Sequence, residues 1–169
     1  MRIAASALTL ALVTAAGCSQ PVDLKQALEM TDVSGGFRDA GIVDGRNKVV
    51  PSISFRLKKT TDRSITPLAL NLSFRKLPLP GVTPAPGSPT EEEWDDAFKA
   101  SVTFDGSQTA LMTFQLNAGY TGDPPQSRAE ILKNSHFQDV RVHVFAKHSS
   151  SQWVEIGQYD LPRQLIAQQ

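Results

Sequence analysis

The stretch that decides the fold is Leu68-Ala69-Leu70-Asn71-Leu72-Ser73-Phe74, in which large apolar residues occupy every second position. Successive side chains of a β-strand point to opposite faces of its sheet, so this alternation is typical of a strand with one buried face. Ile53-Ser54-Phe55-Arg56-Leu57 repeats the pattern. An amphipathic helix would instead repeat its apolar positions roughly every three to four residues. Both stretches are therefore predicted to be strands.

Further runs of the same kind predict strands over 98–104, 110–116, 140–146 and 153–161, and another around 28–33. Asp44-Gly45 and Asp105-Gly106 lie between runs and are typical of hairpin turns. Short alternating strands separated by frequent turns are characteristic of an all-β, antiparallel β-sandwich, here of about seven strands. Long helical connections are missing, which argues against a parallel α/β fold. One helical turn is expected at 128–133.

A proline-rich segment interrupts the alternation. Residues 78–89 contain five prolines and predict an exposed, extended loop. Ser88 and Glu91 have the spacing of a capping box, so a short helix is predicted to follow the loop. Trp94 and Ala97 would then share one helical face.

The N-terminal residues look like a targeting signal. Residues 1–17 contain one arginine, an uninterrupted apolar run and small residues directly before Cys18, as in a secretory signal peptide. Residues 3–16 are too short for a membrane-spanning helix, which needs about 20 residues. Ala15-Ala16-Gly17-Cys18 resembles the lipobox of bacterial lipoproteins. The resemblance implies cleavage before Cys18, fatty acyl chains such as palmitate on that residue and, because Ser19 follows instead of Asp, sorting to the outer membrane. A secreted protein with a chance cysteine at this position is the alternative.

Removal of residues 1–17 from the 169 leaves 152, enough for one domain with a real core. The expected division is a lipoprotein signal peptide over 1–17, a lipidated N-terminus and tether over 18–27, and a β-sandwich over 28–166. Lys plus Arg and Asp plus Glu both number 17, and no basic stripe exists, so nucleic acid is not an expected partner. Cys18 is the only cysteine, so stability must come from the core and not from disulfides.

No catalytic or metal-binding pattern stands out. The histidines are His136, His143 and His148, and none lies near a nucleophile motif such as Gly-x-Ser-x-Gly. His143 alternates with valines in a predicted strand and is expected to face solvent. The acidic run 91–96 lacks the ligand spacing and the glycine of a calcium loop. The chain is therefore predicted not to be an enzyme and to carry no metal or other cofactor.

Trp94, Tyr120 and Glu92 are the candidate binding residues. Aromatic side chains near a proline-rich loop can form a platform for a peptide or a sugar, and aromatic residues are enriched at protein interfaces. The sequence leaves open whether Trp94 belongs to such a surface or to the core. Trp153 is expected in the core, where the tryptophans of sandwiches are mostly packed.

The first predicted hairpin carries a family resemblance. Val50-Pro51-Ser52-Ile53-Ser54-Phe55-Arg56-Leu57-Lys58, followed by Thr61-Asp62 and by the run from Leu68 to Phe74, resembles the first hairpin of the FxLyD-type Ig-like domains of bacterial lipoproteins. In that hairpin a strand with alternating Phe and Leu leads into a Thr/Ser-Asp turn and a second alternating strand. The resemblance implies an Ig-like sandwich without an assigned activity.

The sequence thus predicts a lipid-anchored, non-catalytic binding or assembly module at the outer membrane, facing the periplasm, with an envelope protein as partner. Its expected contact surface is the proline-rich segment together with the adjacent acidic segment that bears Trp94. The alternative is a lipoprotein that binds a small ligand or a glycan. Capture of a partner strand by an open sheet edge is a further mode of binding for such a fold.

Overall fold

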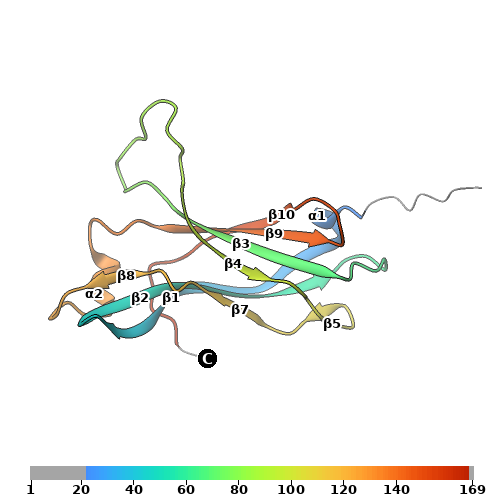
Figure 1. Cartoon of the computed structure of the whole chain (residues 1–169), viewed down its shortest axis with the longest axis horizontal. Coiled ribbons are helices and arrows are strands. Elements are labelled where there is room, and N and C mark those ends of the chain that lie inside the picture. The colour runs from blue at the N-terminus through green and yellow to red at the C-terminus, as the bar shows by residue number, and fades with distance from the viewer. Residues whose placement is uncertain (1–21, 168–169) are drawn as a thin grey trace, which may run out of the picture.

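The computed structural model describes residues 22–167, and these form two antiparallel sheets packed face to face (Figure 1). The prediction of an all-β sandwich is confirmed at this level. The six-stranded sheet contains β1 (Leu28–Val43), β2 (Arg46–Lys59), β5 (Phe104–Asp105), β6 (Gln108–Thr109), β7 (Met112–Gln115) and β8 (Tyr120–Gly122). The four-stranded sheet contains β3 (Leu68–Lys76), β4 (Glu92–Lys99), β9 (Val140–His148) and β10 (Val154–Asp160).

The pairing pattern leaves several strands at sheet edges. The four-stranded sheet has the order β10-β9-β3-β4, so β10 and β4 are its edges. In the six-stranded sheet the long β2 pairs with β1 on one side, and with β6, β7 and β8 in succession on the other. Because β4 and β7 lie on the same side of the sandwich, two sheet edges face one another there (Figure 1).

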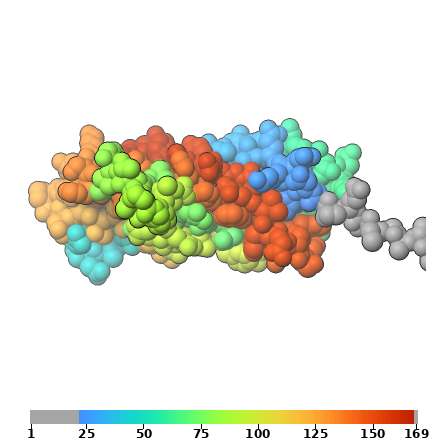
Figure 2. Space-filling model, turned by 90° about the horizontal axis from the view of Figure 1, so that it is seen from above, coloured from blue at the N-terminus to red at the C-terminus, as the bar shows by residue number. Residues whose placement is uncertain are grey.

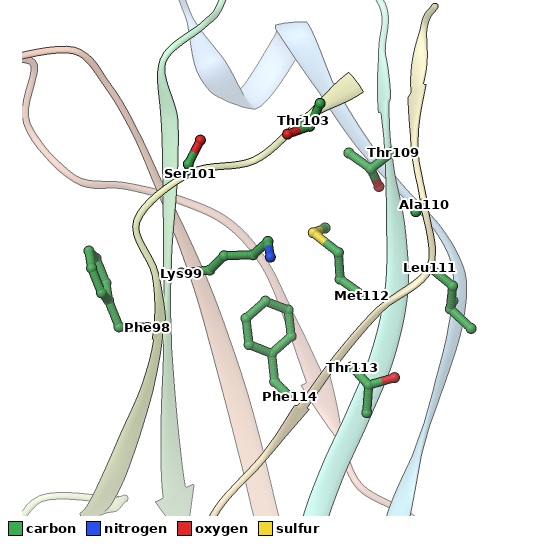
Figure 3. Close-up of a pocket in the computed structure, with 10 residues that line it drawn as sticks. All are labelled: Phe98, Lys99, Ser101, Thr103, Thr109, Ala110, Leu111, Met112, Thr113 and Phe114. Carbon is green, nitrogen blue, oxygen red and sulfur yellow. The ribbon is translucent and has the colours of Figure 1, made fainter. Parts of the chain in front are cut away.

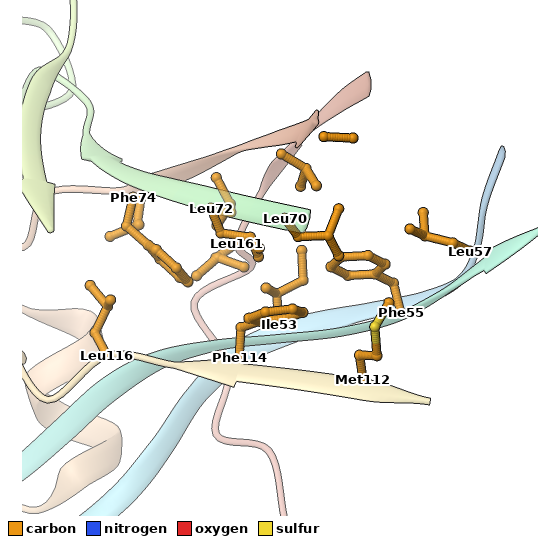
Figure 4. Close-up of a cluster of buried hydrophobic side chains, with 14 of the residues drawn as sticks. Ile53, Phe55, Leu57, Leu70, Leu72, Phe74, Met112, Phe114, Leu116 and Leu161 are labelled. Carbon is orange, nitrogen blue, oxygen red and sulfur yellow. The ribbon is translucent and has the colours of Figure 1, made fainter. Parts of the chain in front are cut away.

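The core lies between the sheets and is supplied by the alternating runs (Figure 4). Ile53, Phe55 and Leu57 project from β2, and each is fully buried. Leu70, Leu72 and Phe74 meet them from β3 and are also fully buried. The ring of Phe55 stacks on Phe114 of β7 with 5.5 Å between centroids, which joins the middle of the core to one open edge.

Both predicted hairpin turns are present. Asp44 and Gly45 join β1 to β2 with φ angles of 51° and 76°. Two successive residues with positive φ form the tight turn that suits the twist of a hairpin, and Asp-Gly is a favoured pair there. Asp105-Gly106 begins the corresponding turn between β5 and β6.

The described residues include two short helices, α1 (Leu24–Ala27) and α2 (Arg128–Lys133). The helical turn predicted at 128–133 is confirmed, and Ser127 caps it in a reciprocal capping box with Glu130. Helix α1 lies in the segment expected as a tether, and its Leu24 and Ala27 are buried against the sandwich. Neither described helix has the length and apolar character needed to cross a membrane.

The helix predicted after the proline-rich segment is wrong, because these residues form β4. Glu93 pairs with Arg75 and Asp95 pairs with Phe74, so Trp94 is the extra residue of a β-bulge. A bulge changes the direction of side chains along a strand. It lets Trp94 and Ala97 both pack against the core at a spacing of three residues, which in the sequence imitates a helix.

Two other predictions are corrected. The strand expected over 98–104 is wrong, because β4 ends at Lys99 and the chain then crosses toward the other sheet. On the way Val102 is buried, and its N–H donates to the carbonyl of Leu68 at 2.9 Å. Trp153 is not a core residue but 40% exposed, because it lies just before β10 on the outer side of the four-stranded sheet.

Candidate interaction site

The loop between β3 and β4, residues 77–91, projects from the body of the sandwich and is called the Pro-rich loop below (Figure 1). It is built from two Pro-Gly turns. The N–H of Val82 donates to the carbonyl of Leu79, and Gly81 has a φ of 80°. Residues 85–88 repeat this arrangement, with Gly87 at a φ of 86°. Proline followed by a glycine of positive φ is the signature of a type II turn, so the loop has a defined internal shape.

The N-terminal base of the Pro-rich loop is fixed to the segment that precedes β9. The N–H of Leu77 donates to the carbonyl of Asp139 at 2.7 Å, and the amide of Gln138 donates to the carbonyl of Leu77 at 3.3 Å. The carboxylate of Asp139 in turn accepts two hydrogen bonds from the guanidinium of Arg163, at 2.6 and 3.0 Å. The loop therefore starts from a fixed position.

The C-terminal base is held by an ionic cluster around Glu91. One carboxylate oxygen lies 3.0 Å from Nη1 of Arg141, and the other lies 2.8 Å from Nε2 of His143 and 3.6 Å from Nη1 of Arg75. The Glu91 side chain is only 14% exposed. Arg141 also forms a two-point ion pair with Asp160, at 2.5 and 2.9 Å, so the cluster extends across β9 to β10.

His143 corrects a prediction, because it is 8% exposed and does not face open solvent. It points to the outer face of its sheet, as the alternation requires, but carboxylates cover it there. Nδ1 lies 3.1 Å from Oε1 of Glu155, while Nε2 contacts Glu91. His143 therefore joins β9, β10 and the C-terminal base of the Pro-rich loop.

We expect this cluster to make stability depend on pH. Burial opposes ionisation of Glu91, but hydrogen bonds and charge from His143 and Arg141 outweigh it and hold the pKa of Glu91 below its ordinary 4.5. The folded state then binds fewer protons than the unfolded chain, so the stabilisation is present above pH 4.5 and is lost as pH falls through the lowered pKa. Urea unfolding of the natural chain and of Glu91→Gln should show a stability gap near neutral pH that narrows in acid. A gap that stays constant across this range would contradict the expectation.

Trp94 and Tyr120, two of the three predicted binding residues, are brought into contact. Their ring centroids lie 5.1 Å apart, and the ammonium of Lys76 lies 4.7 Å above the Trp94 ring. The Tyr120 hydroxyl donates to the carbonyl of Gln138 at 2.8 Å, and burial together with the charge of Asp139 raises the Tyr120 pKa above its ordinary value. Trp94 is thus half-buried, and it packs against the core beside Tyr120 and Lys76.

Glu92, the third predicted residue, lies in register with Lys76 at the start of β4. It also lines a small pocket of about 190 Å³ at the foot of the Pro-rich loop, together with Val82, Pro84 and Gln138. Glu92, Glu93, Asp95 and Asp96 are all exposed. The Pro-rich loop thus continues directly into an acidic strand.

In the described part of the chain no strand pairs with the outer side of β4. Open strand edges are templates for pairing with another chain, and charged side chains or bulges limit which chains can pair. Strand β4 has both: four acidic residues and the bulge at Trp94. Its edge therefore repels a second copy of itself and favours a neutral or basic strand.

A groove of about 430 Å³ lies beside this edge, between the end of β4 and β7 (Figure 3). Phe98 and Lys99 line it from β4, while Met112 and Phe114 line it from β7 and belong to the core. This volume falls within the range of about 300–1,000 Å³ found for ligand pockets. The groove therefore gives access from outside to apolar core side chains.

The other predicted features have these positions. His136 is exposed and His148 half-buried, and neither belongs to the Glu91 cluster. Among residues 22–167 no three His, Cys, Asp or Glu side chains are arranged to hold a metal ion. Cys18 and the signal peptide lie outside the described residues.

The sequence did not reveal Glu91, Arg141 and His143 as one cluster. Glu91 lies 50 positions before Arg141 and 52 positions before His143, and only the pairing of distant strands brings it to them. The alternation of side chains did place Arg141 and His143 on one face of a strand. This is the single local signal in the sequence that could have suggested the cluster. No protein-family model, curated protein or solved structure matches this chain.

Proposed function

We propose that the chain is a lipid-anchored cell-envelope protein whose Ig-like β-sandwich acts as a non-catalytic binding or assembly module. The sequence Ala15-Ala16-Gly17-Cys18 supports acylation at Cys18, and Ser19 supports sorting to the outer membrane. On this proposal the domain faces the periplasm and holds another envelope protein.

The observation that carries the proposal is the construction of the Pro-rich loop. Two hydrogen-bonded turns shape it, and both of its bases are fixed to β9 and the segment before it. Residues 80–90 are nevertheless exposed, apart from the half-buried Pro84. A segment that is already ordered before binding loses less conformational entropy when a partner attaches. An ordered, exposed, apolar loop is therefore suited to recognition.

The neighbouring edge of β4 extends the same surface. A partner segment can pair its backbone with β4 while its side chains enter the groove toward Met112 and Phe114. The four acidic residues of β4 favour a partner strand that carries lysine or arginine. The loop and the strand edge together form one proposed contact surface, which is apolar along the loop and acidic along β4.

Site-specific photocrosslinking in native membranes tests this surface. A photoreactive residue at Val82, which is 56% exposed in the Pro-rich loop, should give one recurrent crosslinked envelope protein. The same residue at Ile42, which is 68% exposed at the β1–β2 hairpin, should not. Equal crosslinking from both positions, or none from Val82, would contradict the proposed surface. Mass spectrometry of the same material reports whether Cys18 is acylated.

A pair of glycine substitutions provides a variant that changes the loop alone. A Cβ at Gly81 or Gly87 meets no atom within 4 Å, so alanine there acts only through the positive φ. We expect Gly81→Ala with Gly87→Ala to abolish the Val82 crosslink while the thermal unfolding midpoint stays nearly unchanged. Gly45→Ala is the matched control, because it has the same strain, a φ of 76°, in a distant turn.

A second candidate function rests on the groove alone. Its volume of about 430 Å³ and its mixed lining suit a small ligand or a glycan. In that case the purified protein binds the ligand without any other protein. Leu111, which is 38% exposed, lines the groove, so Leu111→Glu should abolish binding of such a ligand by the purified protein. The Gly81→Ala, Gly87→Ala variant separates the two functions, because it should abolish the Val82 crosslink and leave ligand binding in the groove intact.

A further inference from the structure

Two exposed aromatic side chains form a pair on the outer face of the four-stranded sheet. Phe98 is 62% exposed and Trp153 is 40% exposed, and their rings meet edge to face with centroids 6.1 Å apart. They are the two aromatic residues among the exposed large apolar side chains of residues 22–167. The ammonium of Lys147 lies 5.8 Å above the Trp153 ring. Phe98, Trp153 and Lys147 are called the aromatic–lysine patch below.

The patch lies toward the end of the sandwich where the described chain begins. Trp153 follows the turn between β9 and β10, and α1 contacts both of these strands. Figures 1 and 2 show α1 and this turn at the same end of the molecule, while the Pro-rich loop rises from the other half. A second lysine–aromatic pair belongs to this end: Lys59 lies 5.5 Å above Phe104, and the next residue, Thr60, donates to the carbonyl of Ala27 in α1.

The length of the chain before α1 sets how far this end can lie from a membrane. Four residue steps separate Cys18 from Val22, where the described chain begins, and a fully extended chain covers at most about 14 Å in that distance. The headgroup layer of one leaflet is itself about 5–8 Å thick. An acylated Cys18 would therefore hold the α1 end of the sandwich against the headgroups.

The chemistry of the patch fits that position. Tryptophan is enriched where hydrocarbon meets headgroups, because its indole is apolar over most of its surface and carries one N–H donor. Lysine buries its methylene stem and keeps its ammonium among phosphates. We propose that the aromatic–lysine patch is a membrane-contact surface that sits in the headgroup layer beside the acylated N-terminus. This inference rests on the proposed anchoring at Cys18, and it adds a fixed orientation in which the Pro-rich loop faces away from the membrane.

The single cysteine and the two tryptophans allow a direct test. The mature chain can be coupled through Cys18 to a maleimide lipid in vesicles of phosphatidylethanolamine and phosphatidylglycerol whose acyl chains carry bromine, a quencher of indole fluorescence. Trp94→Phe leaves Trp153 as the only tryptophan, and Trp153→Phe leaves Trp94, at the foot of the Pro-rich loop. We expect the vesicles to remove most of the Trp153 emission and to leave the Trp94 emission unchanged.

Two variants separate contact from simple proximity. Phe98→Ser and Lys147→Glu should each restore Trp153 emission on the coupled protein, because they remove the apolar and the cationic contact. The inference would be overturned if the vesicles quenched Trp153 emission no more than Trp94 emission. It would also be overturned if quenching of Trp153 occurred only when another protein was added. These outcomes are independent of the native modification: an unacylated Cys18 in cells would instead contradict the proposed anchor.

Discussion

Phe55→Ala should lower the free energy of unfolding by about 3–5 kcal/mol, the loss typical of removing a buried aromatic ring. Phe55 is fully buried, and its ring stacks on Phe114 between the two sheets (Figure 4). Alanine removes the apolar area and leaves a cavity whose walls belong to strands on both sides. Because a domain is stable by only about 5–15 kcal/mol, urea unfolding should show a large shift of the midpoint.

Phe98→Ala is the matched control for this prediction, since it removes the same ring from a position that is 62% exposed. We expect it to change stability by about 0.5 kcal/mol or less, as exposed substitutions usually do. Equal losses from both variants would mean that Phe55 is not packed as described. The comparison therefore tests burial and not the chemistry of phenylalanine.

Glu91→Ala should lower the free energy of unfolding by about 3 kcal/mol, as expected when one partner of a largely buried ion pair is removed. The substitution removes one of the two carboxylates that Arg141 and His143 each contact, at 3.0 and 2.8 Å, and leaves only Asp160 and Glu155 beside them. It also releases the C-terminal base of the Pro-rich loop, so protease cleavage within the loop should become faster.

Glu92→Ala tests the same prediction from the neighbouring position. Glu92 is exposed, so its removal should leave both the unfolding midpoint and the loop cleavage rate nearly unchanged. If Glu91→Ala unfolds at the same urea concentration as Glu92→Ala, the ionic cluster does not stabilise the fold. The two variants differ by one position and remove the same functional group.

The fold was predictable from the sequence wherever one strand had a buried and an exposed face. The run from Leu68 to Phe74 became β3, and its alternation correctly separates fully buried leucines from half-buried Ala69 and Asn71. The capping signal was misleading at Ser88 and Glu91, because the Glu91 carboxylate is engaged by side chains of β9 and not by a helix. Such contacts depend on pairing between distant segments, which no local pattern records.

The candidate site was predictable only in its composition. Trp94, Tyr120 and Glu92 do lie near the foot of the Pro-rich loop, but their arrangement depends on the bulge at Trp94 and on the packing of β8 beneath β4. Trp153 was misplaced because burial of an aromatic residue depends on its strand's position in the sheet. The sequence shows which residues are apolar and how they are spaced. The order of the strands in the sheet decides which of them other segments cover.

The strand order also has a mechanical consequence. Strand β3 leads into the Pro-rich loop at one half of the sandwich, and it pairs with β9 along its whole length, from Leu68 to Lys76. A partner held by the loop and an anchor at the α1 end would pull along the strands (Figure 1). The anchored chain enters through β1 of one sheet and the loop leaves from β3 of the other, so this force would act parallel to the strands of both sheets. Hydrogen bonds between strands loaded in this direction break together instead of one after another. If the proposed anchor and partner are both engaged, the sandwich would therefore carry tension along its strands.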